Sequence, residues 1–172
     1  MKTSTGLPYR RSVRLPKVDY AAAGRWMITI CTFRRQHIFG KITNGVIELN
    51  LLGKIAALQW EASRLLRPEI ELDEWTVMPN HLHGIVFIPD SNLETRPASG
   101  VTVRPARSLG SFVAGYKAAV TSAIRAEMHD TRFKVWQDSF HEHGIRSMHA
   151  LDRLRIYVRE NPIRWLEDPE NI

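Results

Sequence analysis

The stretch WTVMPNHLHGIVFIP, residues 75–89, decides how the fold of this 172-residue chain is interpreted. Residues 70–78 and 82–88 are rich in β-branched and other apolar residues, and the Pro-Asn pair between them is typical of a turn. The sequence therefore predicts a β-hairpin. Two histidines, His81 and His83, interrupt its second strand, which raises the question of what they bind.

The spacing of the two histidines permits a metal site. In a β-strand, side chains two residues apart point to the same face, about 6.6 Å from each other at a rise of ~3.3 Å per residue. His81 and His83 can therefore converge on one ion while Leu82 faces the opposite side. Each imidazole would need a metal–nitrogen bond of ~2.1 Å, and a further ligand must come from elsewhere. Histidines on the polar face of a half-buried sheet are also common as plain surface residues, so both interpretations stay open.

Outward from the hairpin, apolar periodicity predicts an alternation of strands and helices. The further predicted elements are a strand over 26–33, a helix over 49–66, a helix from Ser108 or Ser111 to about Met128, an extended stretch over 133–146 and a helix over 148–160. A connection rich in Pro, Ser, Gly and Arg, about 89–107, is expected to be flexible. The order β-α-β-β-α-β plus a last helix is typical of an α+β fold, a ferredoxin-like antiparallel sheet with its helices on one face.

Composition indicates one ordinary globular domain. The chain has a mass of 19.8 kDa, and it is 44% hydrophobic and 24% charged. No apolar run approaches the roughly 20 residues of a membrane-spanning helix, and the amino terminus lacks the apolar core of a secretory signal, so we expect a cytoplasmic protein. The single Cys31 lies in the apolar stretch RWMITICTF, which favours a buried, inert thiol.

The positive charge is concentrated at the amino terminus. Residues 1–35 hold eight basic residues and one acidic residue, a balance of +7, so the other 137 residues sum to −1 of the total of +6. Residues 1–25 are therefore interpreted as a basic arm ahead of one domain over 26–172. Such an arm would attract a phosphate backbone, and the alternative is a solvated, flexible terminus.

A second pair of polar residues lies in RIYVRENPIRW, residues 155–165. Tyr157 and Asn161 are four positions apart, which places them on one face of a helix, one turn from each other. They can therefore share a site. Taken separately, each has a simpler interpretation: Tyr157 as a tyrosine of the core, and Asn161 as a residue that ends a helix before a proline.

Taken together, these motifs resemble the HUH single-tyrosine transposases (histidine, hydrophobic residue, histidine), in particular the REP-associated tyrosine transposases of bacteria. The resemblance covers nearly the full length, in RRSVRL, AGRWMITICTF, LDEWTVMPNHLHGIVFI, SLGSFVAGYKAAVT, VWQDSFHEHGIR and IYVRENPIRW. By position it implies that His81, His83 and Asn161 bind a divalent ion, Mg²⁺ or Mn²⁺, and that Tyr157 is the nucleophile. It also implies a ferredoxin-like HUH domain.

The implied activity is metal-dependent cleavage of single-stranded DNA and strand transfer through a 5′-phosphotyrosine link, by an active or a domesticated transposase. The implied partner is single-stranded DNA that contains a hairpin, bound by a monomer or a homodimer. A phenol of pKa ~10 is only about a thousandth ionised at pH 7, and a metal would polarise the scissile phosphate that it attacks. The candidate DNA-binding residues are Arg10, Arg11, Arg14, Arg34, Arg35, Lys117 and Arg146.

The remaining tyrosines are weaker candidates for the nucleophile. Tyr116 has Val120 at the +4 position, which cannot bind a metal, so core packing is the better interpretation. Tyr9 and Tyr20 belong to the basic arm, where stacking on a base is the most that we infer. The Gly-Thr-Ser signature of the REP-associated group is absent near the amino terminus, where AAAGRWMIT stands instead, so recognition of a REP-like hairpin stays open.

Two other functions remain possible from the sequence. One is a catalytically silent protein that binds structured single-stranded DNA and does not need Tyr157. The other is a metallohydrolase that activates water on His81, His83, His141 and His143, since His141-Glu142-His143 repeats the spacing of the first pair. The resemblance favours a structural or supporting role for His143 and a surface position for His141.

Overall fold

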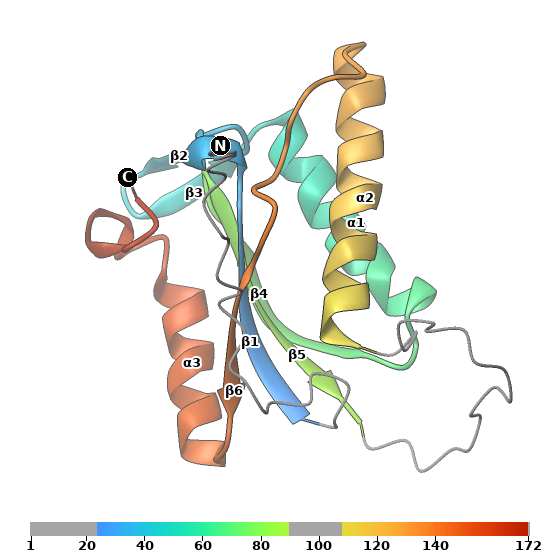
Figure 1. Ribbon diagram of the computed structural model, residues 1–172. Coiled ribbons are helices and arrows are strands. Elements are labelled where there is room, and N and C mark those ends of the chain that lie inside the picture. The colour runs from blue at the N-terminus through green and yellow to red at the C-terminus, as the bar shows by residue number, and fades with distance from the viewer. Residues whose placement is uncertain (1–23, 90–107, 172) are drawn as a thin grey trace, which may run out of the picture.

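The computed structural model of the protein describes residues 24–89 and 108–171. Predictions about the basic arm and nearly all of the connection between the hairpin and the next helix lie outside these residues. Figure 1 shows the described elements as three layers, a sheet with helices on both of its faces.

Four antiparallel strands form the central sheet, in the order β4-β5-β1-β6. Their bounds are β1 Gly24–Cys31, β4 Glu71–Val77, β5 His81–Ile88 and β6 His141–Ile145. β5 pairs with β1 along its whole length, so that His83 stands opposite Thr29, and β4 completes the predicted hairpin on its other side. This order confirms the expected α+β fold with a ferredoxin-like antiparallel sheet.

Helices α1 (Leu51–Leu66) and α2 (Leu109–Met128) pack against one face of this sheet (Figure 1). Side-chain caps start both helices, because Asn50 accepts from the backbone N–H of Gly53 and Ser108 accepts from that of Ser111. The larger hydrophobic core lies between these helices and the sheet.

A glycine lets the core tryptophan lie directly under the strand that carries the histidines. A Cβ at Gly84 would stand only 2.5 Å from Cζ2 of Trp60, a side chain with 0% exposure. Any larger residue at this position would push the indole away from β5, or β5 away from the indole. In the sequence HLHG, the two histidines therefore lie on one face of β5, and the glycine on the other face lets the Trp60 indole approach the strand closely.

The last helix, α3 (Met148–Glu160), covers the opposite face of the sheet (Figure 1). The expectation of helices on one face thus holds for α1 and α2, whereas α3 forms a third layer. Its buried contacts are few, since Leu151 and Val158 pack on Met27 and Ile85 in a small second cluster. The predicted bounds of 148–160 agree with the structure.

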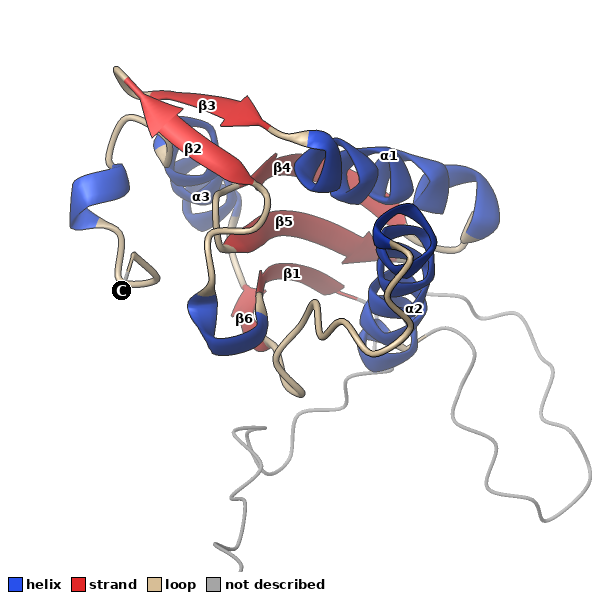
Figure 2. Ribbon diagram, turned by 90° about the horizontal axis from the view of Figure 1, so that it is seen from above, coloured by secondary structure: helices blue, strands red, loops and turns tan. Residues whose placement is uncertain are grey.

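A short hairpin that sequence reasoning missed precedes α1. β2 (Gly40–Thr43) and β3 (Val46–Leu49) form a separate two-stranded sheet, and β3 leads into α1 (Figure 2). The two turn residues, Asn44 and Gly45, have φ angles of 52° and 74°, as a tight two-residue turn requires. The Asn-Gly pair was the signal in the sequence for this turn.

The predicted extended stretch over 133–146 is only partly a strand. β6 covers its last five residues, and before them Trp136 makes one isolated bridge with Thr32. Two short 3₁₀ turns, η1 (Phe33–Arg35) and η2 (Trp165–Glu167), were not predicted. Across residues 24–89 and 108–171, no helix combines the length and the apolar character needed to cross a membrane.

Candidate functional site

His81 and His83 lie side by side on the face of β5 that α3 covers. Their ring centroids are 4.4 Å apart, and the residues are 0% and 2% exposed. Leu82, between them, packs into the core on the other face. The two imidazoles therefore share one face of the strand, as their spacing predicts, and neither is a surface residue.

Asn80 determines which nitrogen of His81 carries the proton. Its Nδ2 donates to the backbone carbonyl of Glu170 at 2.7 Å, so its Oδ1 faces His81 and accepts from Nδ1 at 2.8 Å. The free lone pair of His81 is therefore on Nε2. On the neighbouring histidine, Nδ1 lies 2.8 Å from the hydroxyl of Thr29. These outer contacts leave the Nε2 atoms of both rings as the candidate ligand atoms.

A carboxylate that sequence reasoning missed faces both histidines. Asp168, just after η2, places Oδ2 3.8 Å from Nε2 of His81 and 3.8 Å from Nε2 of His83, and its side chain is fully buried. Burial alone would raise the pKa of Asp168, but contacts with His83, a backbone N–H and the Asn161 amide lower that pKa to about 2. The site therefore contains an ionised carboxylate.

Tyr157 and Asn161 reach the same place from α3. The hydroxyl of Tyr157 lies 3.5 Å from Nε2 of His83, and Asn161 donates through Nδ2 to Oδ2 of Asp168 at 2.5 Å. Burial, followed by the negative charge of Asp168, raises the pKa of Tyr157 to about 12. The predicted phenol, amide and histidine pair thus meet in one site, where the phenol is held in its neutral form.

The donor set fits a divalent metal ion. Among the described residues, ligand atoms of His81, His83 and Asp168 all lie within 4.8 Å of one another. Two of the buried side-chain atoms without a hydrogen-bond partner, His81 Nε2 and Asn161 Oδ1, belong to this site. Burial, together with the adjacent His83, lowers the pKa of His81 well below its ordinary value, so the imidazole is in the neutral form that binds metals.

The C-terminal segment is anchored over this site by Glu170. Its carboxylate pairs with Arg35 and accepts from the thiol of Cys31 at 3.1 Å, while its carbonyl accepts from Asn80. Trp165, on the same segment, stacks on His81 with ring centroids 6.1 Å apart. Asp168 is therefore held between anchors on both of its sides.

The candidate DNA-binding residues fall in different places. Arg35 is the partner of Glu170, and the exposed Arg34 holds its guanidinium 5.2 Å from the Phe33 ring centroid. Arg146 is exposed between β6 and α3. The remaining arm residues, Arg10, Arg11 and Arg14, lie outside the described part of the chain. A role in DNA binding stays a prediction for all of them.

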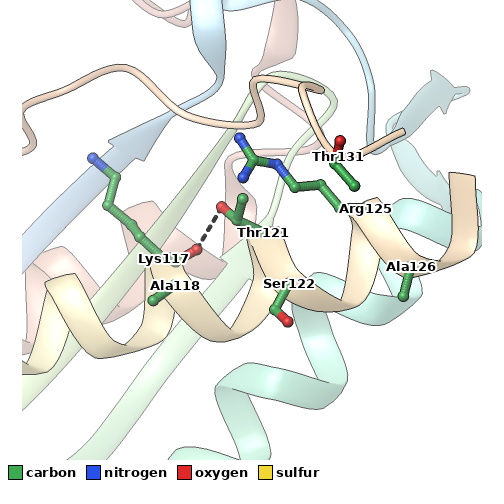
Figure 3. Close-up of a pocket in the computed structure, with 7 residues that line it drawn as sticks. All are labelled: Lys117, Ala118, Thr121, Ser122, Arg125, Ala126 and Thr131. Atoms are coloured by element: carbon green, nitrogen blue, oxygen red, sulfur yellow. Dashed lines mark hydrogen bonds between the residues drawn. The ribbon is translucent and has the colours of Figure 1, made fainter. Parts of the chain in front are cut away.

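Lys117 lies on α2, in the layer opposite to the histidines. Its Nζ donates to the backbone carbonyls of Gln137 and Ser139 at 2.5 and 3.0 Å, and burial lowers its pKa. It borders an open groove along α2, with Thr121 and Arg125 further along (Figure 3). Its interaction with DNA stays a prediction, and the contacts that it makes here hold the segment before β6.

The four-histidine cluster of the hydrolase interpretation does not form. His141 and His143 are exposed on β6, and β1 lies between this strand and β5. Neither residue belongs to the group of ligand atoms around Asp168. The surface position expected for His141 agrees with the structure.

Two other expectations concern buried residues. Tyr116 is 3% exposed and donates its hydroxyl to the carbonyl of Ala56 at 3.0 Å, which confirms core packing. Cys31 is 2% exposed, and burial, followed by the contact with Glu170, raises the pKa of its thiol to about 12. Both side chains are therefore held in their neutral forms.

Comparison with known proteins identifies a relative along almost the whole chain. An uncharacterized protein of Haemophilus influenzae is 34% identical over 174 residues, which cover 97% of this chain and 96% of that protein. The chain belongs to the same family as this protein. No protein-family model matches the sequence.

Solved structures identify the fold. A REP-associated tyrosine transposase bound to a REP hairpin has a TM-score of 0.62 and 19% identity, over 91% of this chain and 74% of that one. The fold is that of this transposase, so the resemblance found in the sequence is confirmed at the level of the fold. A second structure, from Deinococcus radiodurans, is 14% identical over 92% of this chain and 96% of that one, with a TM-score of 0.46.

Proposed function

We propose that the protein cleaves single-stranded DNA and transfers the cut strand through a covalent link to Tyr157, with a divalent ion bound by the two histidines. The observation that carries this proposal is the position of the Tyr157 hydroxyl, 3.5 Å from Nε2 of His83, at the edge of the candidate metal site. A phenol beside a metal-binding histidine pair combines a nucleophile with a site for the electrophile.

The residues that would hold the ion are His81 and His83 through Nε2, Asn161 through Oδ1 and Asp168 through a carboxylate oxygen. Mixed nitrogen and oxygen ligands suit Mn²⁺, and Mg²⁺ is the alternative. When bound, the ion would polarise the scissile phosphate and screen its charge. Asn80 would keep the His81 lone pair directed at the ion.

Cleavage would exchange one phosphoester bond for another. The oxygen of Tyr157 forms a bond to phosphorus, the bond from phosphorus to the 3′-oxygen breaks, the phenol loses its proton and the 3′-oxygen gains one. The 5′-phosphotyrosine link keeps the phosphoester, so the 3′-hydroxyl of another strand can reverse the step without ATP. The substrate would be single-stranded at the cut.

The comparisons and the charge distribution suggest the DNA to test first. The transposase with the same fold is bound to a REP hairpin, so a hairpin with single-stranded flanks is the first candidate here. The basic arm, Arg34 and Arg146 are proposed to contact its backbone. The described residues of one chain supply all four candidate ligands and the phenol, which is compatible with either a monomer or a homodimer.

The test incubates the protein with labelled hairpin oligonucleotides from the DNA that flanks its own gene, with Mn²⁺ or Mg²⁺, and separates the products on denaturing gels. We expect a covalent protein–DNA adduct that EDTA prevents and that Tyr157→Phe abolishes. Tyr20→Phe, which removes a phenol that the sequence assigns to the basic arm, is the matched control and should keep the adduct.

Other outcomes would separate the alternatives. Cleavage without an adduct, unchanged in Tyr157→Phe, would refute the tyrosine mechanism in favour of activated water. Tight binding of the hairpin with no cleavage in either metal would refute the enzyme and leave a DNA-binding protein.

A further inference from the structure

The helix that carries Tyr157 has little apolar contact with the sheet. The buried hydrophobic residues of α3 are Leu151 and Val158, and the partly buried Leu154 and Tyr157 pack beside them. The core on the other face of the sheet has twenty buried residues. Such a narrow apolar stripe leaves a helix able to roll about its own axis unless other contacts prevent it. Rotation of α3 about its own axis would therefore move the hydroxyl of Tyr157, which lies at the edge of this apolar stripe.

Two arginines tie α3 to the edge strand β4. Arg155 donates through Nε and Nη2 to both carboxylate oxygens of Asp73, at distances of 2.7 to 3.1 Å. Arg159, one turn later, pairs with Glu74 at 2.6 Å. Burial would raise the pKa of Asp73, but hydrogen bonds from Arg155 and a backbone N–H hold it below its usual value. The Arg155–Asp73 pair is bidentate and partly buried. A bidentate pair of this kind fixes the orientation of the two side chains relative to each other.

An irregularity in β4 makes both contacts possible. The pairing of β4 with β5 shifts register between Leu72 and Trp75, and the two residues within the shift are Asp73 and Glu74. In a regular strand, neighbouring side chains point to opposite faces, so only one of these carboxylates would reach the helix. A bulge re-aims side chains in this way. Here it presents two consecutive acids to one helix.

The arginines and the tyrosine lie on opposite flanks of the apolar stripe. At about 100° per residue, Arg155 and Arg159 are about 40° apart around α3, and Tyr157 is about 160° from each of them. Val158 lies between the two flanks and points at the sheet. A helix held on its stripe and clamped on one flank cannot roll, so the other flank is aimed at His83.

We propose that the ion pairs Arg155–Asp73 and Arg159–Glu74 are a rotation lock that positions Tyr157 against the metal site. The proposal rests on the proposed function for its catalytic consequence, whereas the placement of the phenol can be measured without it. These four residues are positioning residues, since none of them contacts the histidines. Misplacement of a reacting group by about 1 Å costs on the order of 100-fold in rate.

The experiment is a charge exchange. Arg155→Asp and Asp73→Arg each place like charges opposite one another, and the double variant restores an ion pair with its signs reversed. Arg132→Asp is the matched control, because Arg132 is an exposed arginine in the turn after α2, and α2 packs on the other face of the sheet from α3.

Two readouts are measured on each variant. The first is the single-turnover rate of adduct formation at saturating DNA and Mn²⁺, with the Kd for DNA measured separately. The second is the ¹⁹F resonance of 3-fluorotyrosine at position 157, assigned by its loss in Tyr157→Phe and recorded without metal or DNA.

We expect each single variant to lower the rate about 10- to 100-fold and to shift the ¹⁹F resonance, with the Kd for DNA within about twofold. The double variant should recover most of the rate and of the resonance position, and Arg132→Asp should change neither. A wild-type resonance and rate in folded single variants would overturn the proposal, as would a double variant no better than the singles. If the wild-type protein forms no adduct, the proposed function fails, and the resonance alone then decides the rotation lock.

Discussion

Replacing Gly84 with alanine should destabilise the protein, because the strand of the two histidines rests directly on an indole ring. The added Cβ would stand 2.5 Å from Cζ2 and 2.6 Å from Cη2 of Trp60. Carbon atoms in contact prefer about 3.5 to 4.0 Å, so the ring would have to move by roughly 1 Å. It has no room, since Phe112 and Tyr116 pack against it with ring centroids 5.5 and 5.2 Å away.

Overpacking of this kind costs about 1 to 3 kcal/mol. In a chain of this length, each kcal/mol shifts the melting temperature by roughly 2 to 4 °C, so Gly84→Ala should lower it by about 2 to 12 °C. Scanning calorimetry measures the shift. Because β5 also carries His81 and His83, the affinity for Mn²⁺ should fall in the same variant.

Gly115→Ala is the control for this prediction. Gly115 is exposed within α2, and a Cβ there would meet only the Arg67 guanidinium at 3.8 Å, an ordinary contact. Alanine in a helix interior is about 0.5 to 1 kcal/mol better than glycine, so this variant should melt slightly higher. A melting temperature that rises in Gly84→Ala as it does in Gly115→Ala would refute the close packing of β5 on Trp60.

Three further predictions concern the site. Asp168→Ala should weaken Mn²⁺ binding at least about tenfold in titration calorimetry, as expected for a lost ligand, and an unchanged affinity would remove Asp168 from the ligand set. Asn80→Ala should weaken Mn²⁺ binding about 10- to 100-fold, because His81 Nδ1 loses the acceptor that orients the ring, and full affinity in this variant would contradict that role. Cys31 should react slowly with iodoacetamide at pH 8, because its thiol pKa is raised to about 12, and Glu170→Ala should speed the reaction several-fold; equal rates in mass spectrometry would show that Glu170 does not shield the thiol.

Much of the fold could be predicted from the sequence because its signals are local. The hairpin, the three helices and their order follow from apolar periodicity and turn residues, and α3 has the predicted bounds. The structure of residues 133–140, just before β6, was harder to predict, because side chains of α2 rather than a neighbouring strand bind backbone carbonyls there. Arg125 donates to the carbonyl of Phe133 and Lys117 to that of Gln137, contacts that leave no pattern in the sequence.

The residues of the site also divide into those that a local sequence signal predicts and those that only tertiary contacts place. His81 and His83 lie two apart on a strand, and Tyr157 and Asn161 four apart on a helix, so each pair could be placed on one face from spacing alone. That the two pairs meet depended on the resemblance, because periodicity does not say which face of the sheet the last helix covers. Asp168 could not be predicted, because it follows a proline-broken helix end, and its position depends on tertiary anchors at Arg35 and Asn80.

The two faces of the sheet bury different kinds of side chain, because side chains along β5 alternate between the faces. Polar side chains face α3, and apolar side chains face α1 and α2. Burying polar groups costs stability unless they are hydrogen-bonded, and this site buries Thr29, two histidines, Asn161 and Asp168 together. The residues of β5 that point the other way, Leu82 and Val86, join the large core under α1 and α2. That core can offset the cost of a polar cluster whose atoms are only partly paired. The small apolar contact of α3 then leaves its orientation to the ion pairs on one flank, and the phenol on the other flank lies beside His83.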